Sequence, residues 1–89
     1  MGKYFVEFED IARKDLKAHY KSGNISTIKK IEKILLELTE NPFSGEGQPE
    51  ELKYNFKGFW SRRIDDEHRL IYRFIDDEIQ ILKCRHHYD

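Results

Sequence analysis

Arginine, histidine and carboxylate side chains gather in the C-terminal half of this 89-residue chain. Gly58–Tyr72 reads GFWSRRIDDEHRLIY, with three arginines, and Cys84–Tyr88 reads CRHHY. Guanidinium groups stabilise negative charge on phosphate oxygens, and imidazole and carboxylate groups transfer protons. These residue types together indicate phosphoryl chemistry.

His87 is the strongest candidate for proton transfer, because a histidine titrates near pH 6.5. His86 is its neighbour, and adjacent residues of a strand point to opposite faces, so the two cannot bind one metal ion together. We therefore expect no metal and no cofactor. Cys84 falls on an apolar face of its strand, which favours packing over chemistry.

The first half of the chain predicts a strand and two helices. Lys3–Phe8 is rich in β-forming residues, and Asp10 can cap a helix that runs to about Lys21. Its apolar stripe has helical spacing. The stripe comprises Phe8, Ala12, Leu16 and His19 or Tyr20.

The second helix is expected to follow after a short break at Ser22–Asn24, where Gly23 can adopt the left-handed conformation. It begins at Ser26 or Thr27 and ends before Asn41–Pro42, since proline disfavours helix in the preceding residue. Its apolar face comprises Ile28, Ile31, Leu35 and Leu38. The short break predicts an antiparallel helical hairpin.

The second half predicts a loop and then strands. The glycines and prolines of NPFSGEGQPEELKY indicate the loop, and Leu52–Tyr54 is a candidate short strand. Longer strands are expected at Phe59–Ile64, His68–Ile75 and Glu78–Tyr88, with turns at Asp65–Glu67 and Asp76–Asp77. The fold class is α+β, in the order β-α-α-β-β-β-β, with the helical hairpin on one face of an antiparallel sheet.

Strand alternation assigns the side chains to two faces, provided that no bulge interrupts a strand. The face under the helices comprises Trp60, Ile64, Leu70, Tyr72, Phe74, Leu82 and Cys84. The opposite, cationic face comprises Phe59, Ser61, Arg63, Arg69, Ile71, Arg73, Lys83, Arg85 and His87. Arg62 falls on the apolar side, so it lies at an edge or the alternation slips there.

The cationic face has two interpretations of about equal weight. It binds an anionic partner such as a phosphate backbone, or its arginines form surface ion pairs with Asp65, Asp66 and Glu67. A net charge of −1 argues against a protein that is basic all over. One cysteine and no long apolar run predict one cytoplasmic domain over residues 1–89, without disulfide or membrane span.

Four segments in order resemble the YoeB toxins of the RelE superfamily, which belong to bacterial type II toxin–antitoxin pairs. They are NPFSGEGQPEELK, GFWSRRI, EHRLIY and the terminal CRHHY. With the second helix, the resemblance covers roughly Ile28–Tyr88. It implies a ribosome-dependent endoribonuclease in which, without a metal ion, the ribose 2′-OH attacks the adjacent phosphate.

The resemblance also implies roles for particular residues. The family's carboxylate, a general base for the 2′-OH, falls on Glu50, with Glu51 beside it as a second carboxylate. Its arginines fall on Arg63 and Arg69, which would stabilise charge on the phosphate, and its C-terminal acid falls on His87. Tyr88 would stack on a base or orient the phosphate, and Lys53 matches the lysine after the carboxylate.

The remaining cationic residues Arg73, Lys83 and Arg85 are expected to bind RNA rather than to react with it. Asp89 extends the chain one residue beyond the tyrosine that usually ends it. Expected partners are the ribosome with its mRNA and a YefM-like antitoxin, whose acidic segment would fold on the cationic face. Monomer and homodimer both remain open. Two other classes also stay open: a ParE-like toxin that poisons DNA gyrase, and a non-catalytic nucleic-acid-binding module.

Overall fold

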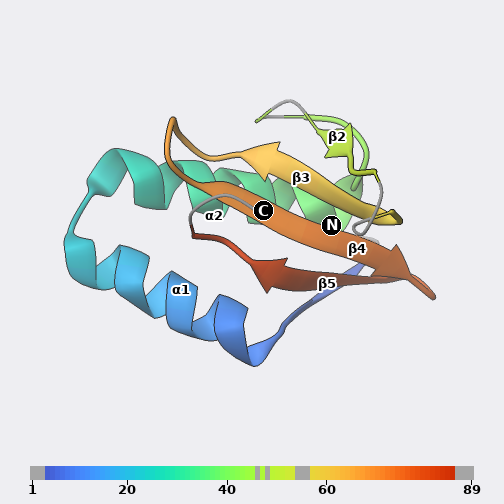
Figure 1. Ribbon diagram of the computed structural model, residues 1–89, viewed down its shortest axis with the longest axis horizontal. Coiled ribbons are helices and arrows are strands. Elements are labelled where there is room, and N and C mark those ends of the chain that lie inside the picture. The colour runs from blue at the N-terminus through green and yellow to red at the C-terminus, as the bar shows by residue number, and fades with distance from the viewer. Residues whose placement is uncertain (1–3, 46, 48, 54–56, 86–89) are drawn as a thin grey trace.

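The computed structural model describes residues 4–45, 47, 49–53 and 57–85. Helices and strands follow one another in the order β1 (Phe5–Phe8), α1 (Asp10–Ser22), α2 (Ile25–Glu40), β2 (Glu50–Glu51), β3 (Phe59–Arg63), β4 (Arg69–Ile75) and β5 (Glu78–Lys83). Both helices lie against the same face of the sheet (Figure 1). The predicted α+β class is therefore confirmed.

The five strands form one sheet in the order β1-β5-β4-β3-β2. The last four strands make the predicted antiparallel meander. β1 instead joins the edge beside β5 in parallel, so the sheet is mixed rather than wholly antiparallel. The helical hairpin between β1 and β2 makes this possible, because it carries the chain across the sheet.

Local capping fixes the helix boundaries. Asn24 caps α2 by accepting a hydrogen bond from the Thr27 backbone N–H at 3.2 Å, so the helix begins at Ile25, slightly before the predicted start. Glu9, not Asp10, occupies the N-cap position of α1. Gly23 adopts the left-handed conformation expected of it, with φ of 72°.

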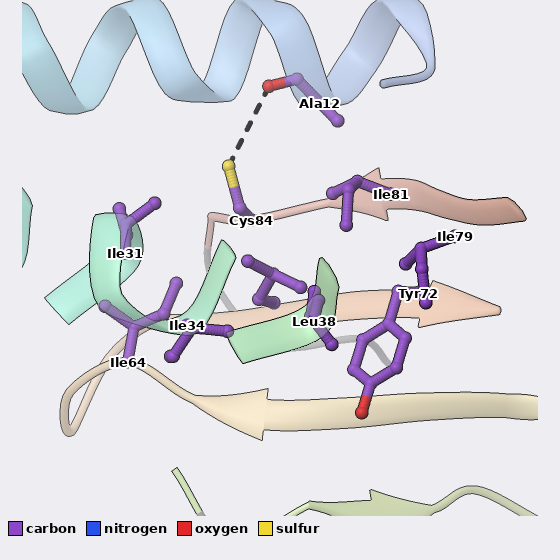
Figure 2. Close-up of a cluster of buried hydrophobic side chains, with 10 residues drawn as sticks. Ala12, Ile31, Ile34, Leu38, Ile64, Tyr72, Ile79, Ile81 and Cys84 are labelled. Atoms are coloured by element: carbon purple, nitrogen blue, oxygen red, sulfur yellow. Dashed lines mark hydrogen bonds between the residues drawn. The ribbon is translucent and has the colours of Figure 1, made fainter. Parts of the chain in front are cut away.

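The core lies between the helices and the sheet (Figure 2). It comprises Ala12, Ile31, Ile34, Leu38, Ile64, Leu70, Tyr72, Ile79, Ile81 and Cys84. Ile34 is fully buried although the predicted helical face omitted it. Leu35, which that face included, is only partly buried.

A bulge in β5 makes part of the predicted face assignment wrong. Tyr72 is paired with Ile81, but the next residue on β4, Ile71, is paired with Lys83, so Leu82 is the extra residue. Ile79 and Ile81 therefore face the core, while Leu82 borders a hollow with Phe59 and Arg73 of the opposite face. Cys84, beyond the bulge, returns to the core as predicted.

Two strand boundaries also differ from the prediction. The short strand before β3 is Glu50–Glu51, not Leu52–Tyr54, and Leu52 is buried beyond its end. β5 ends at Lys83, whereas the sequence suggested that it continues to Tyr88. Residues 54–56 and 86–89 lie outside the described part of the chain.

The turns follow the predicted positions. Asp76 and Asp77 connect β4 to β5, and both have positive φ, as a tight hairpin requires. Within the described residues, no helix has the length and apolar character needed to cross a membrane.

Candidate active site on the open sheet face

Glu50 lies in a row of side chains on the sheet face away from the helices. It is paired with Ser61 on β3, which is paired with Ile71 on β4 and through it with Lys83 on β5. Residues paired across a sheet point to the same face, and neighbouring strands are about 4.8 Å apart. The Glu50 carboxylate is therefore anchored one strand from Ser61.

Arg63 and Arg69 are paired directly with each other across β3 and β4, on the same open face. Arg63 is two residues beyond Ser61, about 7 Å along the strand. Arg69 Nη1 donates to the Ser61 hydroxyl at 3.4 Å, a long hydrogen bond. The structure thus brings Glu50, Ser61, Arg63 and Arg69 onto one part of the sheet.

Two like charges directly opposite each other destabilise a sheet. Arg63 is partly compensated by Asp66, whose Oδ1 lies 2.5 Å from Arg63 Nη2. That pair is exposed, with Asp66 98% accessible, so its contribution to stability is small. An anion bound between Arg63 and Arg69 would remove the repulsion, so this arrangement fits an anion-binding surface.

Glu51 lies opposite Trp60, one residue along the same ladder. Adjacent residues of a strand face opposite ways, so its side chain is directed away from the Arg63–Arg69 pair. Of the two adjacent carboxylates, Glu50 alone shares a sheet face with both arginines.

The other predicted cationic residues are spread out. Arg73 is on the open face two strand positions beyond Ile71, where its Nε donates to Gln80 Oε1 at 2.8 Å and its guanidinium lies 5.5 Å from the Phe59 ring centre. Lys83 shares the row of Glu50. Lys53 is exposed just after β2. His87 and Tyr88 lie outside the described residues.

Arg85 lies at another edge. It borders a polar cavity of about 310 Å³ with His19 of α1 and His68 of the β3–β4 connection. The two histidine rings meet edge to face, with centres 4.7 Å apart. Arg85 therefore lies beside α1 and the β3–β4 connection, whereas strand alternation predicted it on the cationic face with Lys83.

Cys84 is held by α1 at the point where β5 ends. Asp15 accepts from its backbone N–H at 3.1 Å, and His19 Nε2 lies 2.6 Å from its carbonyl oxygen. Its thiol points at the Ala12 carbonyl (Figure 2). Burial, together with the negative charge of Asp15, raises the pKa of Cys84 to about 12. Such a thiol is a packing group and not a nucleophile at neutral pH.

No cluster of three or more His, Cys, Asp or Glu side chains suited to a metal ion occurs among the described residues.

Arg62 is the residue whose importance the sequence left undecided. It is fully buried on the helix side of β3, with no slip in the alternation, and it binds the loop that leads to β2. In the sequence, the one sign of this role was that an arginine occupies a position on the apolar side of the strand.

Comparison with known proteins shows the family to which this chain is similar. Residues 8–88 match the model of the "YoeB-like toxin of bacterial type II toxin-antitoxin system". A curated relative, Toxin YoeB of Mycobacterium bovis, is 45% identical over 83 residues, which are 93% of this chain and 96% of that protein.

Solved structures agree. The YoeB dimer from Staphylococcus aureus superposes with a TM-score of 0.82 at 37% identity, over 97% of this chain and 99% of that one. The YoeB–YefM complex from the same organism gives 0.81 at 38% identity, over 96% and 98%. The fold and the family match are those of a toxin from a type II toxin–antitoxin pair. Within that class, the chain belongs to the YoeB-like toxin family.

Proposed function

We propose that this toxin is a ribosome-dependent endoribonuclease that cleaves mRNA and so stops translation. The observation that carries the proposal is the pairing of Arg63 with Arg69 on the face that also holds Glu50. A carboxylate beside two guanidinium groups provides a proton acceptor and a site for a phosphate. The YoeB family membership supports the same reaction.

In the proposed reaction, Glu50 removes the proton of the ribose 2′-OH. The oxygen then attacks the adjacent phosphorus, and Arg63 and Arg69 stabilise the negative charge that builds on the phosphate oxygens. The 5′-oxygen leaves with a proton from His87, and a 2′,3′-cyclic phosphate remains. Tyr88 stacks on a base or orients the phosphate.

The shape of the site supports a role for the ribosome. Glu50 and Glu51 are exposed, and the arginines lie on a sheet face rather than inside a deep cleft. Such a surface holds a flexible RNA poorly by itself, so positioning by the ribosome would supply much of the rate. Lys53, Arg73, Lys83 and Arg85 would add affinity for the RNA backbone.

The regulatory partner is proposed to be a YefM-like antitoxin, whose acidic segment folds over the cationic face and blocks the phosphate site. The S. aureus complex supports this partner, and the S. aureus dimer supports a homodimer as a further assembly. The proposed site of action is the cytoplasm, where ribosomes translate.

Mapping of mRNA 5′ ends after induction without antitoxin tests the activity. We expect growth arrest and discrete cuts inside translated messages, and none in the same transcript with its start codon removed. Arrest with intact mRNA and trapped gyrase–DNA complexes would indicate a ParE-like activity instead. Normal growth with folded protein present would exclude both toxins and leave a binding module.

A further inference from the structure

Arg62 is a charged residue in the middle of β3 whose side chain is 0% exposed. Burying a charge is unfavourable unless partners replace the lost water. An apolar residue could fill the same volume at equal or lower cost, so the presence of arginine requires a reason beyond packing.

The hydrogen bonds of Arg62 lead to the segment after α2. Its Nη2 donates to the carbonyl oxygens of Asn41 at 3.1 Å and Ser44 at 2.7 Å, and its Nη1 donates to Glu37 Oε1 at 2.9 Å. Tyr72, which accepts a long bond of 3.4 Å from Arg62 Nε, donates to the Pro42 carbonyl at 2.5 Å. One buried guanidinium, with the tyrosine beside it, therefore anchors three loop carbonyls.

Two glycines continue this anchorage toward β2. A Cβ on Gly45, which has φ of +126°, would collide with the Glu37 carboxylate and lie 2.9 Å from Arg62 Nη1. A Cβ on Gly47 would lie 2.6 Å from the Arg63 carbonyl oxygen, and the Gly47 carbonyl accepts from the Arg63 N–H at 2.7 Å. The loop thus lies directly on Arg62 and β3.

β2 is a two-residue strand with few contacts of its own. It contributes only the pairs Glu50–Ser61 and Glu51–Trp60, followed by the hydrogen bond from Leu52 N–H to the Phe59 carbonyl at 2.9 Å. So short a strand has little stability of its own. Arg62 bonds the loop before β2 at Asn41 and Ser44, and Glu50 follows Gly47 by three residues.

We propose that Arg62 is a positioning residue for Glu50: it sets the loop that holds the carboxylate over Ser61 and does not contact the RNA. The inference rests on the proposed function, because it assigns Arg62 a role in that reaction. Lysine cannot replace it, since one ammonium group lacks the planar fork that reaches several acceptors at once.

The first test compares Arg62→Lys with wild type in single-turnover mRNA cleavage, with the toxin pre-bound to saturating ribosomes. A misplaced catalytic group can cost about 10²-fold in rate, so we expect a loss of about 10- to 100-fold with ribosome affinity unchanged. Arg62→Lys combined with Glu50→Gln should be no slower than Glu50→Gln alone. If the two losses multiply, Arg62 does not act through Glu50 and the proposal is wrong.

Gly45→Ala provides a second variant should Arg62→Lys fail to fold. It displaces the loop from outside the core, because the new methyl group meets Glu37 and Arg62. Gly23→Ala is the control: its φ of +72° also puts alanine at positive φ, but the methyl group meets no atom within 4 Å. Cleavage should fall for Gly45→Ala and stay near wild type for Gly23→Ala. Equal cleavage by both variants would overturn the proposal.

Amide hydrogen exchange separates this inference from the proposed function. The Arg63 N–H is bonded to Gly47, so Arg62→Lys and Gly45→Ala should speed its exchange relative to the other β3 amides. If the Arg63 amide exchanges faster in both variants but the wild-type toxin cuts no mRNA, the loop anchor is supported and the proposed reaction is wrong. If exchange of the Arg63 amide is unchanged in both variants, Arg62 does not hold the loop, whatever the cleavage activity.

Discussion

Glu50 and Ser61 are directly paired across the β2–β3 ladder, and this pairing decides which of two adjacent carboxylates shares a face with the arginines. Glu51, paired with Trp60, has the opposite orientation. Sequence alone could not separate the two, because a two-residue strand has no recognisable alternation.

The first prediction compares these carboxylates. Glu50→Gln should slow single-turnover cleavage on the ribosome by about 10²–10⁴-fold, the usual contribution of a positioned acid or base. Glu51→Gln, which makes the same chemical change on the other face, should stay within about threefold of wild type. The reverse result would place the reacting RNA on the helix side of β2.

The second prediction divides the arginines by role. Arg69→Ala should lower the single-turnover rate by roughly 10²–10³-fold at saturating ribosomes, because it removes charge stabilisation from the transition state. Arg73 lies farther along β4 and is bonded to Gln80. Arg73→Ala should weaken ribosome binding and reduce the salt dependence of that binding, while the cleavage rate of the bound complex stays unchanged. A slow bound complex for Arg73→Ala would move that residue into the chemistry.

The fold was largely predictable from the sequence because its elements have strong local signals. Helical spacing located α1 and α2, and turn residues such as Asp76 and Asp77 separated the strands. The bulge at Leu82 was missed because Ile79 and Ile81 favour one alternation of β5, whereas Leu82 and Cys84 favour the other. The parallel pairing of β1 with β5 depends on long-range contacts that no local pattern records.

The candidate site was predictable to a different degree. Resemblance to the family identified Glu50, Arg63 and Arg69, and strand alternation alone placed the arginines on one face. Arg62 showed only as a misfit in the apolar alternation, because two of its acceptors are backbone carbonyls that carry no side-chain signature. Their identity depends on how the loop after α2 is folded.

The third prediction concerns stability and pH. Burial by itself would raise the pKa of Asp65, but hydrogen bonds from the Glu67 and His68 amides, and then from Thr27, bring it below the ordinary value. A lowered folded-state pKa means that the stabilisation is complete above the unfolded value of about 3.9 and is lost as the pH falls through the folded value.

Asp65→Asn should therefore reduce the free energy of unfolding by about 1–2 kcal/mol at pH 7, the scale of charge-assisted hydrogen bonds. The difference from wild type should shrink as the pH falls below about 4. Urea unfolding at a series of pH values measures this. Asp76→Asn, an exposed turn residue in which asparagine tolerates the positive φ, should show no such narrowing. A pH-independent deficit for Asp65→Asn would mean that its charge does not stabilise the turn.

The fourth prediction concerns the proton donor, and it rests on the sequence because His86 and His87 lie outside the described residues. His87→Gln should leave folding unchanged and slow cleavage by about 10²–10⁴-fold, since the leaving 5′-oxygen loses its general acid. His86→Gln should cost far less, because the family resemblance assigns the acid to His87 and not to its neighbour. The single-turnover cleavage rates of both variants are compared with the enzyme pre-bound to ribosomes. A strong loss for His86→Gln with a neutral His87→Gln would assign the general acid to His86 instead. The pH profile then identifies the acid: the group that titrates near neutrality in wild type should disappear from the profile of His87→Gln. If it persists, another group, such as Tyr88, an arginine or a ribosomal residue, protonates the leaving oxygen.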